Sequence, residues 1–116
     1  MEPKHGRGYV YSLQYHIVWC VKYRRKILTP QVKDFLIETL ENIAIEKGFT
    51  ILEINTDLDH IHILVDCNPQ HYIPDLLKIM KGRTSRLLMQ KFPYLKNCLW
   101  GGHILSHQYQ KILKNR

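Results

Sequence analysis

Acidic residues and long apolar stretches are both scarce in this chain of 116 residues. Asp and Glu number 10 against 17 Lys and Arg, a formal net charge of +7, which argues against an acidic surface. No apolar run is long enough to span a bilayer, and no secretory apolar segment follows the N-terminus. The three cysteines, Cys20, Cys67 and Cys98, are odd in number and lack Cys-x-x-Cys spacing, which favours reduced thiols over a disulfide framework. We therefore expect a cytoplasmic protein with no membrane-spanning segment.

The sequence contains enough apolar residues for one core. They make up 45% of the chain, which excludes a disordered basic tail and predicts a single domain over residues 1–116. A folded domain with this positive charge usually binds a polyanion, most often nucleic acid. Charge alone leaves ribosomal and membrane-surface binding open, so motifs must decide between them.

Hydrophobic periodicity predicts an α+β fold. Alternation predicts strands, and a helix is expected to start at Pro30, with Thr29 as its N-cap, and to stop at Gly48. The order β-α-β-β-α-β is that of the ferredoxin-like fold, an antiparallel sheet with both helices on one face and the other face open. The predicted strands are Val10–Cys20, Phe49–Thr56, Leu58–Asp66 and Leu99–Tyr109, and the second helix is Pro74–Lys91.

Two histidines lie in the third predicted strand. His60 and His62 are separated by Ile61, so they project from the same face of the strand, away from the helices. Two imidazoles side by side on a rigid strand can bind a divalent metal ion. The same pattern fits two surface histidines on a half-exposed sheet, and the motif by itself does not decide between them.

Basic residues form two groups, 22–26 after the first strand and 81–86 in the second helix. Glycine inside a helix costs about 1 kcal/mol relative to alanine, so Gly82 needs a reason such as the close approach of a backbone. Cations with hydroxyls suit phosphate contacts, and Tyr15 and Tyr23 offer rings for base stacking. Solvated charges are the alternative, but the net charge favours nucleic acid. The expected nucleic-acid contacts are Lys22, Tyr23, Arg24, Arg25, Lys26, Lys81, Arg83, Ser85 and Arg86.

Five motifs together carry a resemblance to a known family. They are Tyr15-His16-Ile17-Val18-Trp19-Cys20, Lys22-Tyr23-Arg24-Arg25-Lys26, Asp59-His60-Ile61-His62, Lys81-Gly82-Arg83-Thr84-Ser85-Arg86 and Leu99-Trp100-Gly101-Gly102-His103. In this order the chain resembles the single-tyrosine HUH transposases of small bacterial insertion sequences, the IS200-like transposase family. The resemblance covers Tyr11 to Tyr109.

The resemblance implies both an activity and its partners. It implies a homodimer that recognises hairpins in single-stranded DNA at transposon ends and cuts and rejoins strands through a phosphotyrosine intermediate. It also implies a divalent metal ion, Mg²⁺ or Mn²⁺, held by His60 and His62, and no nucleotide cofactor. An unpaired edge of the sheet invites a second copy, so we expect the last strand to be the dimer seam.

The nucleophile is the main departure from the family. In the family a tyrosine on a C-terminal helix follows the Trp-Gly-Gly-His strand, and a glutamine one turn later completes the metal site. Here Leu113 stands four residues after Tyr109, where that glutamine would be. We therefore expect that the catalytic helix is missing or replaced by residues 110–116, in a decayed copy or a shortened form. Alternatively, Tyr109 is the nucleophile, with Gln108 or Gln110 as a metal ligand.

The sequence is also compatible with other functions and with other roles for its histidines. A catalytically dead copy could act only as a DNA-binding module and repress an active relative in mixed dimers. A replication-initiator nuclease shares the His-x-His strand but is normally longer. Charge and fold alone also allow a metal-dependent RNA-binding or ribosome-associated protein. We interpret His16 as a sheet histidine or a DNA contact, and His103 and His107 as structural.

Overall fold

The computed structural model describes residues 4–6, 9–11, 13–100 and 107–112. The elements follow one another along the chain as strands β1 (Lys4–Gly6), β2 (Tyr9–Tyr11) and β3 (Leu13–Cys20), the 3₁₀ turn η1 (Lys22–Arg24), helix α1 (Pro30–Lys47), strands β4 (Thr50–Asp57) and β5 (His60–Cys67), helix α2 (Ile73–Lys91), the 3₁₀ turn η2 (Pro93–Leu95) and strand β6 (His107–Ile112).

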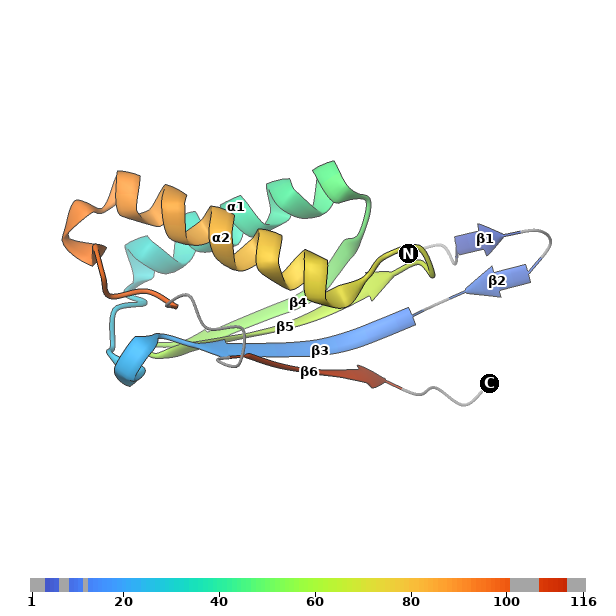
Figure 1. Ribbon diagram of the computed structural model, residues 1–116, viewed down its shortest axis with the longest axis horizontal. Coiled ribbons are helices and arrows are strands. Elements are labelled where there is room, and N and C mark those ends of the chain that lie inside the picture. Colours follow the sequence, from blue (N-terminus) through green and yellow to red (C-terminus); the bar gives the residue numbers. More distant parts are fainter. Residues whose placement is uncertain (1–3, 7–8, 12, 101–106, 113–116) are drawn as a thin grey trace.

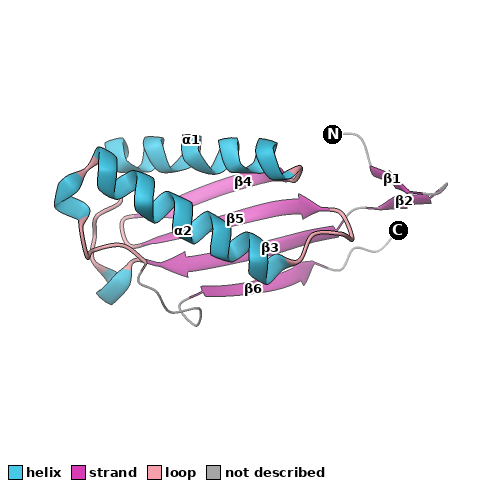
Figure 2. Ribbon diagram, turned by 45° about the horizontal axis from the view of Figure 1, so that its top comes forward, coloured by secondary structure: helices cyan, strands magenta, loops and turns pink. Residues whose placement is uncertain are grey.

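Four strands form one antiparallel sheet in the order β4-β5-β3-β6. Both helices lie on the same face of this sheet, which leaves the other face uncovered (Figures 1 and 2). The order β3-α1-β4-β5-α2-β6 matches the predicted α+β, ferredoxin-like arrangement, and the fold class is confirmed. Strands β1 and β2 form a separate two-stranded ribbon beyond the end of β3 (Figure 1).

Helix α1 begins and ends where the sequence predicts. Pro30 occupies the first helical position, where its missing N–H costs no hydrogen bond. Gly48 adopts the left-handed conformation with φ of 80°, and its N–H donates to the Ala44 oxygen at 2.9 Å. Thr29 stands at the N-cap, but its side chain makes no capping hydrogen bond.

The first and last predicted strands differ from the structure. Val10 belongs to β2, so the first strand of the sheet begins only at Leu13. Leu99 and Trp100 lie in a bend rather than a strand, and β6 extends past Tyr109. Trp100 is buried under α2, where its indole Nε1 donates to Thr84 Oγ1 at 2.9 Å; this contact holds the bend against the helix layer. His103, interpreted as structural, lies outside the described residues, and His107 is the first residue of β6.

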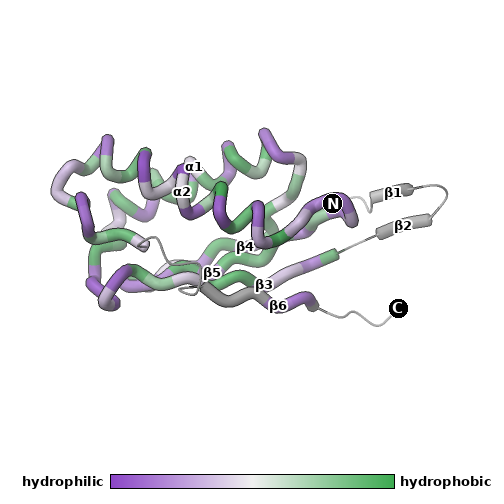
Figure 3. The backbone as a smooth tube through the Cα atoms, in the orientation of Figure 1, coloured by the Kyte–Doolittle hydropathy of each residue, from purple (hydrophilic) through white to green (hydrophobic). Residues whose placement is uncertain are grey.

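The core lies between the helices and the covered face of the sheet. In the register of β3 against β5, Ile17 stands opposite Ile63 and Trp19 opposite Ile61, and all four are fully buried. Hydrophobic and hydrophilic positions alternate along both helices (Figure 3), as expected of helices with one buried side. Full burial of an aliphatic side chain stabilises the fold by about 1.5–3 kcal/mol. The fully buried apolar residues of the two helices are Val32, Leu36, Leu40, Leu77, Met80 and Leu88.

Candidate metal and nucleic-acid site

His60 and His62 lie on the open face of the sheet. Their strand neighbours Ile61 and Ile63 are fully buried on the covered face, whereas the two histidines are only partly buried. Neighbouring side chains of a strand point to opposite faces of the sheet. This alternation in β5 confirms the predicted placement of both histidines on one face. The register sets His62 opposite Val18 on one side and Asn55 on the other.

His16 of β3 contacts His62. Its Nδ1 lies 2.5 Å from Nε2 of His62, and the two rings stack with centroids 4.5 Å apart. Burial, and secondarily the His16 ring, lower the pKa of His62. His62 is therefore neutral near pH 7, the form in which an imidazole binds a metal ion. A ligand bond from Nε2 of His62 requires the contact with His16 to open.

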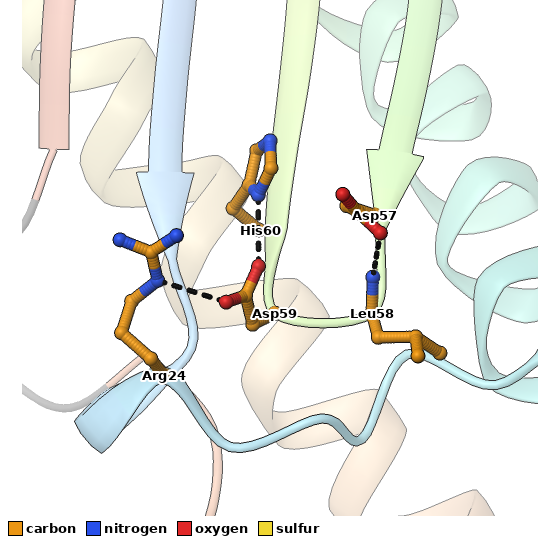
Figure 4. Close-up of polar contacts among 5 residues, drawn as sticks. All are labelled: Arg24, Asp57, Leu58, Asp59 and His60. Carbon is orange, nitrogen blue, oxygen red and sulfur yellow. Dashed lines mark hydrogen bonds and ion pairs between the residues drawn. The ribbon is translucent and has the colours of Figure 1, made fainter.

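The carboxylate of Asp59 bridges His60 and the basic segment formed by residues 22–26 (Figure 4). Its Oδ1 lies 2.9 Å from His60 Nδ1, and its Oδ2 accepts a hydrogen bond from Arg24 Nε at 3.1 Å. The hydrogen bond from His60, and then that from Arg24, lower the pKa of Asp59, and Asp59 raises the pKa of Arg24. All three groups come from the β4–β5 turn, the start of β5 and η1. The sequence motif contained Asp59, but nothing in its spacing indicated this bridge.

Residues 22–26 form an exposed basic segment beside this turn. The flanking N–H groups fix its position: Val21 N donates to Asp59 O at 2.8 Å and Leu28 N to Leu58 O at 2.9 Å. The structure therefore brings all five candidate contacts of this segment to the end of the sheet where His60 begins β5.

Tyr23 is the most prominent side chain of the basic segment. It is 77% exposed and has a positive φ of 58°, as does Arg24 with 54°. Lys22 Nζ and Arg25 Cζ lie 5.4 and 5.5 Å from the centre of the Tyr23 ring. Non-glycine residues rarely adopt positive φ, and such strain gathers at functional sites. An exposed ring near two cations offers a nucleobase a stacking surface close to two phosphate-binding charges.

The second basic group lies in the helix layer, on the other side of the sheet from the histidines. Lys81 is only 8% exposed, and burial lowers its pKa, which differs from the exposed position that a phosphate contact requires. Arg83 Nη1 binds Glu46 Oε1 at 2.7 Å, an ion pair that raises the pKa of Arg83 and lowers that of Glu46. Arg86 is exposed and Ser85 partly so.

Two sequence interpretations of this helix are wrong. A Cβ atom built on Gly82 would meet no atom within 4 Å in the described part of the chain, so no backbone approaches it there. Thr84, grouped with the phosphate contacts, is fully buried, and its hydroxyl donates to Met80 O at 2.6 Å while accepting from Trp100.

The register of β6 places the backbones of Tyr109 and Gln110 beside β3. In the register of β6 against β3, Tyr109 stands opposite Ile17, which belongs to the covered face. Gln110 stands opposite His16 and is exposed. Cross-strand partners share a face of the sheet, so the register assigns Gln110 to the open face.

The residues on the open face fit a divalent metal ion with few protein ligands. Over the described ranges, no group of three or more His, Cys, Asp or Glu side chains is arranged to hold a metal ion. Two imidazoles, one of them oriented by a carboxylate, are nevertheless a donor set that divalent ions accept, with water in the remaining positions. His60 and His62 are the residues that would hold such an ion. Neither helix of the described chain has the length and apolar character needed to cross a membrane.

Sequence comparisons match this chain to transposases. The family model described as "Transposase IS200 like" matches residues 9–112. The ISDra2 transposase TnpA of Deinococcus radiodurans is 42% identical over 109 residues, which cover 94% of this chain and 78% of that protein. The transposase of insertion sequence IS200 from Salmonella typhimurium is 30% identical over 86 residues, or 74% of this chain and 57% of that protein.

Solved structures show the same fold. A crystal structure from Deinococcus radiodurans, classed as a transposase, superposes with a TM-score of 0.83 at 36% identity and covers 97% of this chain and 86% of that one. A REP-associated tyrosine transposase bound to a REP hairpin superposes with a TM-score of 0.66 at 14% identity, covering 98% and 64%; at that identity the likeness concerns the fold alone. The family match spans nearly the whole chain, and we conclude that the chain belongs to the IS200-like transposase family.

Proposed function

We propose that this protein is a transposase that binds hairpins in single-stranded DNA and cuts and rejoins strands through a phosphotyrosine intermediate. Family membership supports the DNA-processing activity. The observation that carries the proposal for a metal site is the shared open face of His60 and His62, with Asp59 bonded to one ring. The basic segment at the same end of the sheet supports DNA binding there.

The proposed reaction needs a tyrosine nucleophile from the chain and a divalent metal ion. A tyrosine oxygen bonds to the scissile phosphorus while the bond from phosphorus to the 3′ oxygen breaks, and the released 3′ oxygen takes up a proton. Rejoining reverses these bond changes, so no high-energy cofactor is consumed. A Mg²⁺ or Mn²⁺ ion held by His60 and His62 would polarise the scissile phosphate and stabilise the departing oxygen. The chain's own task is to hold the ion through His60 and His62 and to keep the strand in place.

The basic segment is proposed to hold the single strand next to the histidines. Lys22, Arg25 and Lys26 are exposed cations suited to phosphates, and Tyr23 is suited to stacking on a base. Arg83, Ser85 and Arg86 lie on the opposite layer, so we propose that they contact a separate part of the hairpin. A structural neighbour bound to a REP hairpin is consistent with this class of ligand.

The nucleophile is open to a direct test. Tyr109 is the tyrosine to examine first, with Gln110 on the open face as a candidate ligand. The register of Tyr109 opposite Ile17, on the covered face, favours the second candidate function, a DNA-binding module that does not cleave. We propose that either form is a homodimer paired along β6, an edge strand of the sheet, and that it acts in the cytoplasm.

A covalent-adduct assay separates these possibilities. The chain is incubated with Mn²⁺ and a single-stranded oligonucleotide carrying a hairpin from the end of its own element, then run on a denaturing gel. We expect a protein–DNA adduct, with the modified tyrosine mapped by mass spectrometry. An adduct lost in Tyr109→Phe assigns the nucleophile, and one that persists assigns another tyrosine. Hairpin binding without any adduct supports the DNA-binding module that does not cleave. Tighter binding to a matched RNA hairpin at equal salt contradicts both candidate functions.

A further inference from the structure

Asp59 is held in place by three hydrogen-bonded contacts, with His60, Arg24 and Val21. Its Oδ1 meets His60 Nδ1, its Oδ2 meets Arg24 Nε, and its backbone oxygen accepts from Val21 N. The Leu58 oxygen, next in the same turn, accepts from Leu28 N. The turn between β4 and β5 is thus fastened to both ends of the basic segment, and the carboxylate has little freedom to leave His60 (Figure 4).

The contact with Asp59 fixes which nitrogen of His60 carries the hydrogen. An ionised carboxylate only accepts hydrogen bonds, so His60 Nδ1 must donate. In a neutral ring the lone pair then lies on Nε2, the atom left available to a metal ion. The ring is also held against rotation, since turning it would break a 2.9 Å hydrogen bond to a group that is itself held by Arg24.

We propose that Asp59 is a positioning residue of the metal site, which keeps His60 in the orientation and tautomer that bind a divalent ion, and that Arg24 supports it by holding its second oxygen. This inference rests on the metal site of the proposed function. It gives Arg24, expected from the sequence to contact DNA, a different primary role. Through Asp59, the position of the basic segment is then coupled to that of β5.

Metal affinity of the full chain tests the positioning role of Asp59. Mn²⁺ binding is measured by titration calorimetry for the wild type, Asp59→Asn and Asp57→Asn. Asp57, the last residue of β4, is the matched control. Its Oδ1 accepts the N–H of Leu58 at 2.9 Å, and its replacement removes the same charge two residues away from Asp59. We expect Asp59→Asn to bind about 10-fold more weakly or worse, and Asp57→Asn to lose less than about threefold.

Replacing Arg24 separates electrostatics from positioning, because the two predict opposite changes in Mn²⁺ affinity. Removing a positive charge near a cation site strengthens cation binding if only charge matters. If Arg24 supports Asp59, Arg24→Gln instead weakens Mn²⁺ binding by about threefold, whereas Arg25→Gln, whose guanidinium contacts Cys98 Sγ, leaves it equal or tighter. Tighter binding in Arg24→Gln overturns the supporting role.

The tautomer of His60 gives a readout that needs no metal. Ring-nitrogen NMR shifts at a pH where the ring is neutral are expected to show hydrogen on Nδ1 in the wild type and a mixture of tautomers in Asp59→Ala. Hydrogen on Nε2 in the wild type, or equal Mn²⁺ affinity of Asp59→Asn and Asp57→Asn, overturns the inference while the metal site stands. If the wild type binds Mn²⁺ no more tightly than the double variant His60→Ala/His62→Ala, both the inference and the proposed metal site are wrong.

Discussion

Nδ1 of His16 lies 2.5 Å from Nε2 of His62, although the two residues are 46 positions apart in the sequence. The contact arises because β3 and β5 are neighbours and both residues occupy the open face. It joins a motif near the N-terminus to the histidine pair and gives His16 a direct influence on a proposed metal ligand.

The pKa of His62 should respond to the loss of His16. Burial by its surroundings and the nearby His16 ring both lower this pKa from the ordinary value of 6.5. Replacing His16 with alanine removes part of the burial and all of the ring's charge, so both changes raise the pKa of His62. NMR titration of the metal-free protein measures it, with His71→Gln as a control remote from the pair. An unchanged or lower pKa in His16→Ala would contradict the contact.

Tyr23 should contribute to single-strand binding far more than other exposed tyrosines. Stacking on a base is worth about 1–3 kcal/mol, so Tyr23→Ala should weaken hairpin binding by roughly 5- to 150-fold, and Tyr23→Phe should retain most of the affinity. Tyr94, which is 68% exposed in the 3₁₀ turn η2, is the matched control. Fluorescence anisotropy at fixed salt makes the comparison, and equal losses for Tyr23→Ala and Tyr94→Ala would rule out a stacking role.

Arg83 and Arg86 should reveal whether the helix layer touches the hairpin. Replacing both with alanine is expected to lower the salt dependence of binding by about one unit per lost phosphate contact. Glu46→Gln provides the counter-test, since it releases Arg83 from its ion pair and should leave binding equal or tighter. A slope that does not change in the double variant would mean that these arginines form only a solvated helix face.

Much of the fold follows from periodicity and chain breakers. Pro30 and Gly48 bound the first helix through the backbone conformations they favour, and a period of two correctly sets His60 and His62 against Ile61. These features are local, since each depends on residues a few positions apart. The fold class follows from their order along the chain.

The errors concern side chains whose surroundings come from distant segments. Lys81 and Thr84 look like surface residues within α2, but the bend that contains Trp100 folds under this helix, and Thr84 is the group that its indole contacts. The role of Asp59 depends on Arg24, 35 positions away, which reaches it only because the basic segment folds back onto the β4–β5 turn. Spacing within a motif carries no information about such contacts.

The buried contact between Thr84 and Trp100 should be measurable as stability. Thr84→Val leaves the buried Trp100 Nε1 without its acceptor, which costs about 1–3 kcal/mol of unfolding free energy. Thr39 is the matched control, because its hydroxyl likewise donates to a carbonyl four residues earlier, that of Phe35, at 2.8 Å. Thr39→Val should cost less than about 1 kcal/mol. Urea denaturation compares them, and equal costs would show that the indole contact adds nothing.

Metal-dependent cleavage of a hairpin substrate tests the central claim most directly. A labelled single-stranded oligonucleotide with the hairpin end is incubated with Mn²⁺ and the wild type, His60→Ala or His62→Ala, with DNA binding measured in parallel. We predict cleavage by the wild type, none after chelation of the metal, and at least a 100-fold loss in either variant while hairpin binding is retained. Cleavage that survives chelation or both substitutions would contradict a metal site at His60 and His62.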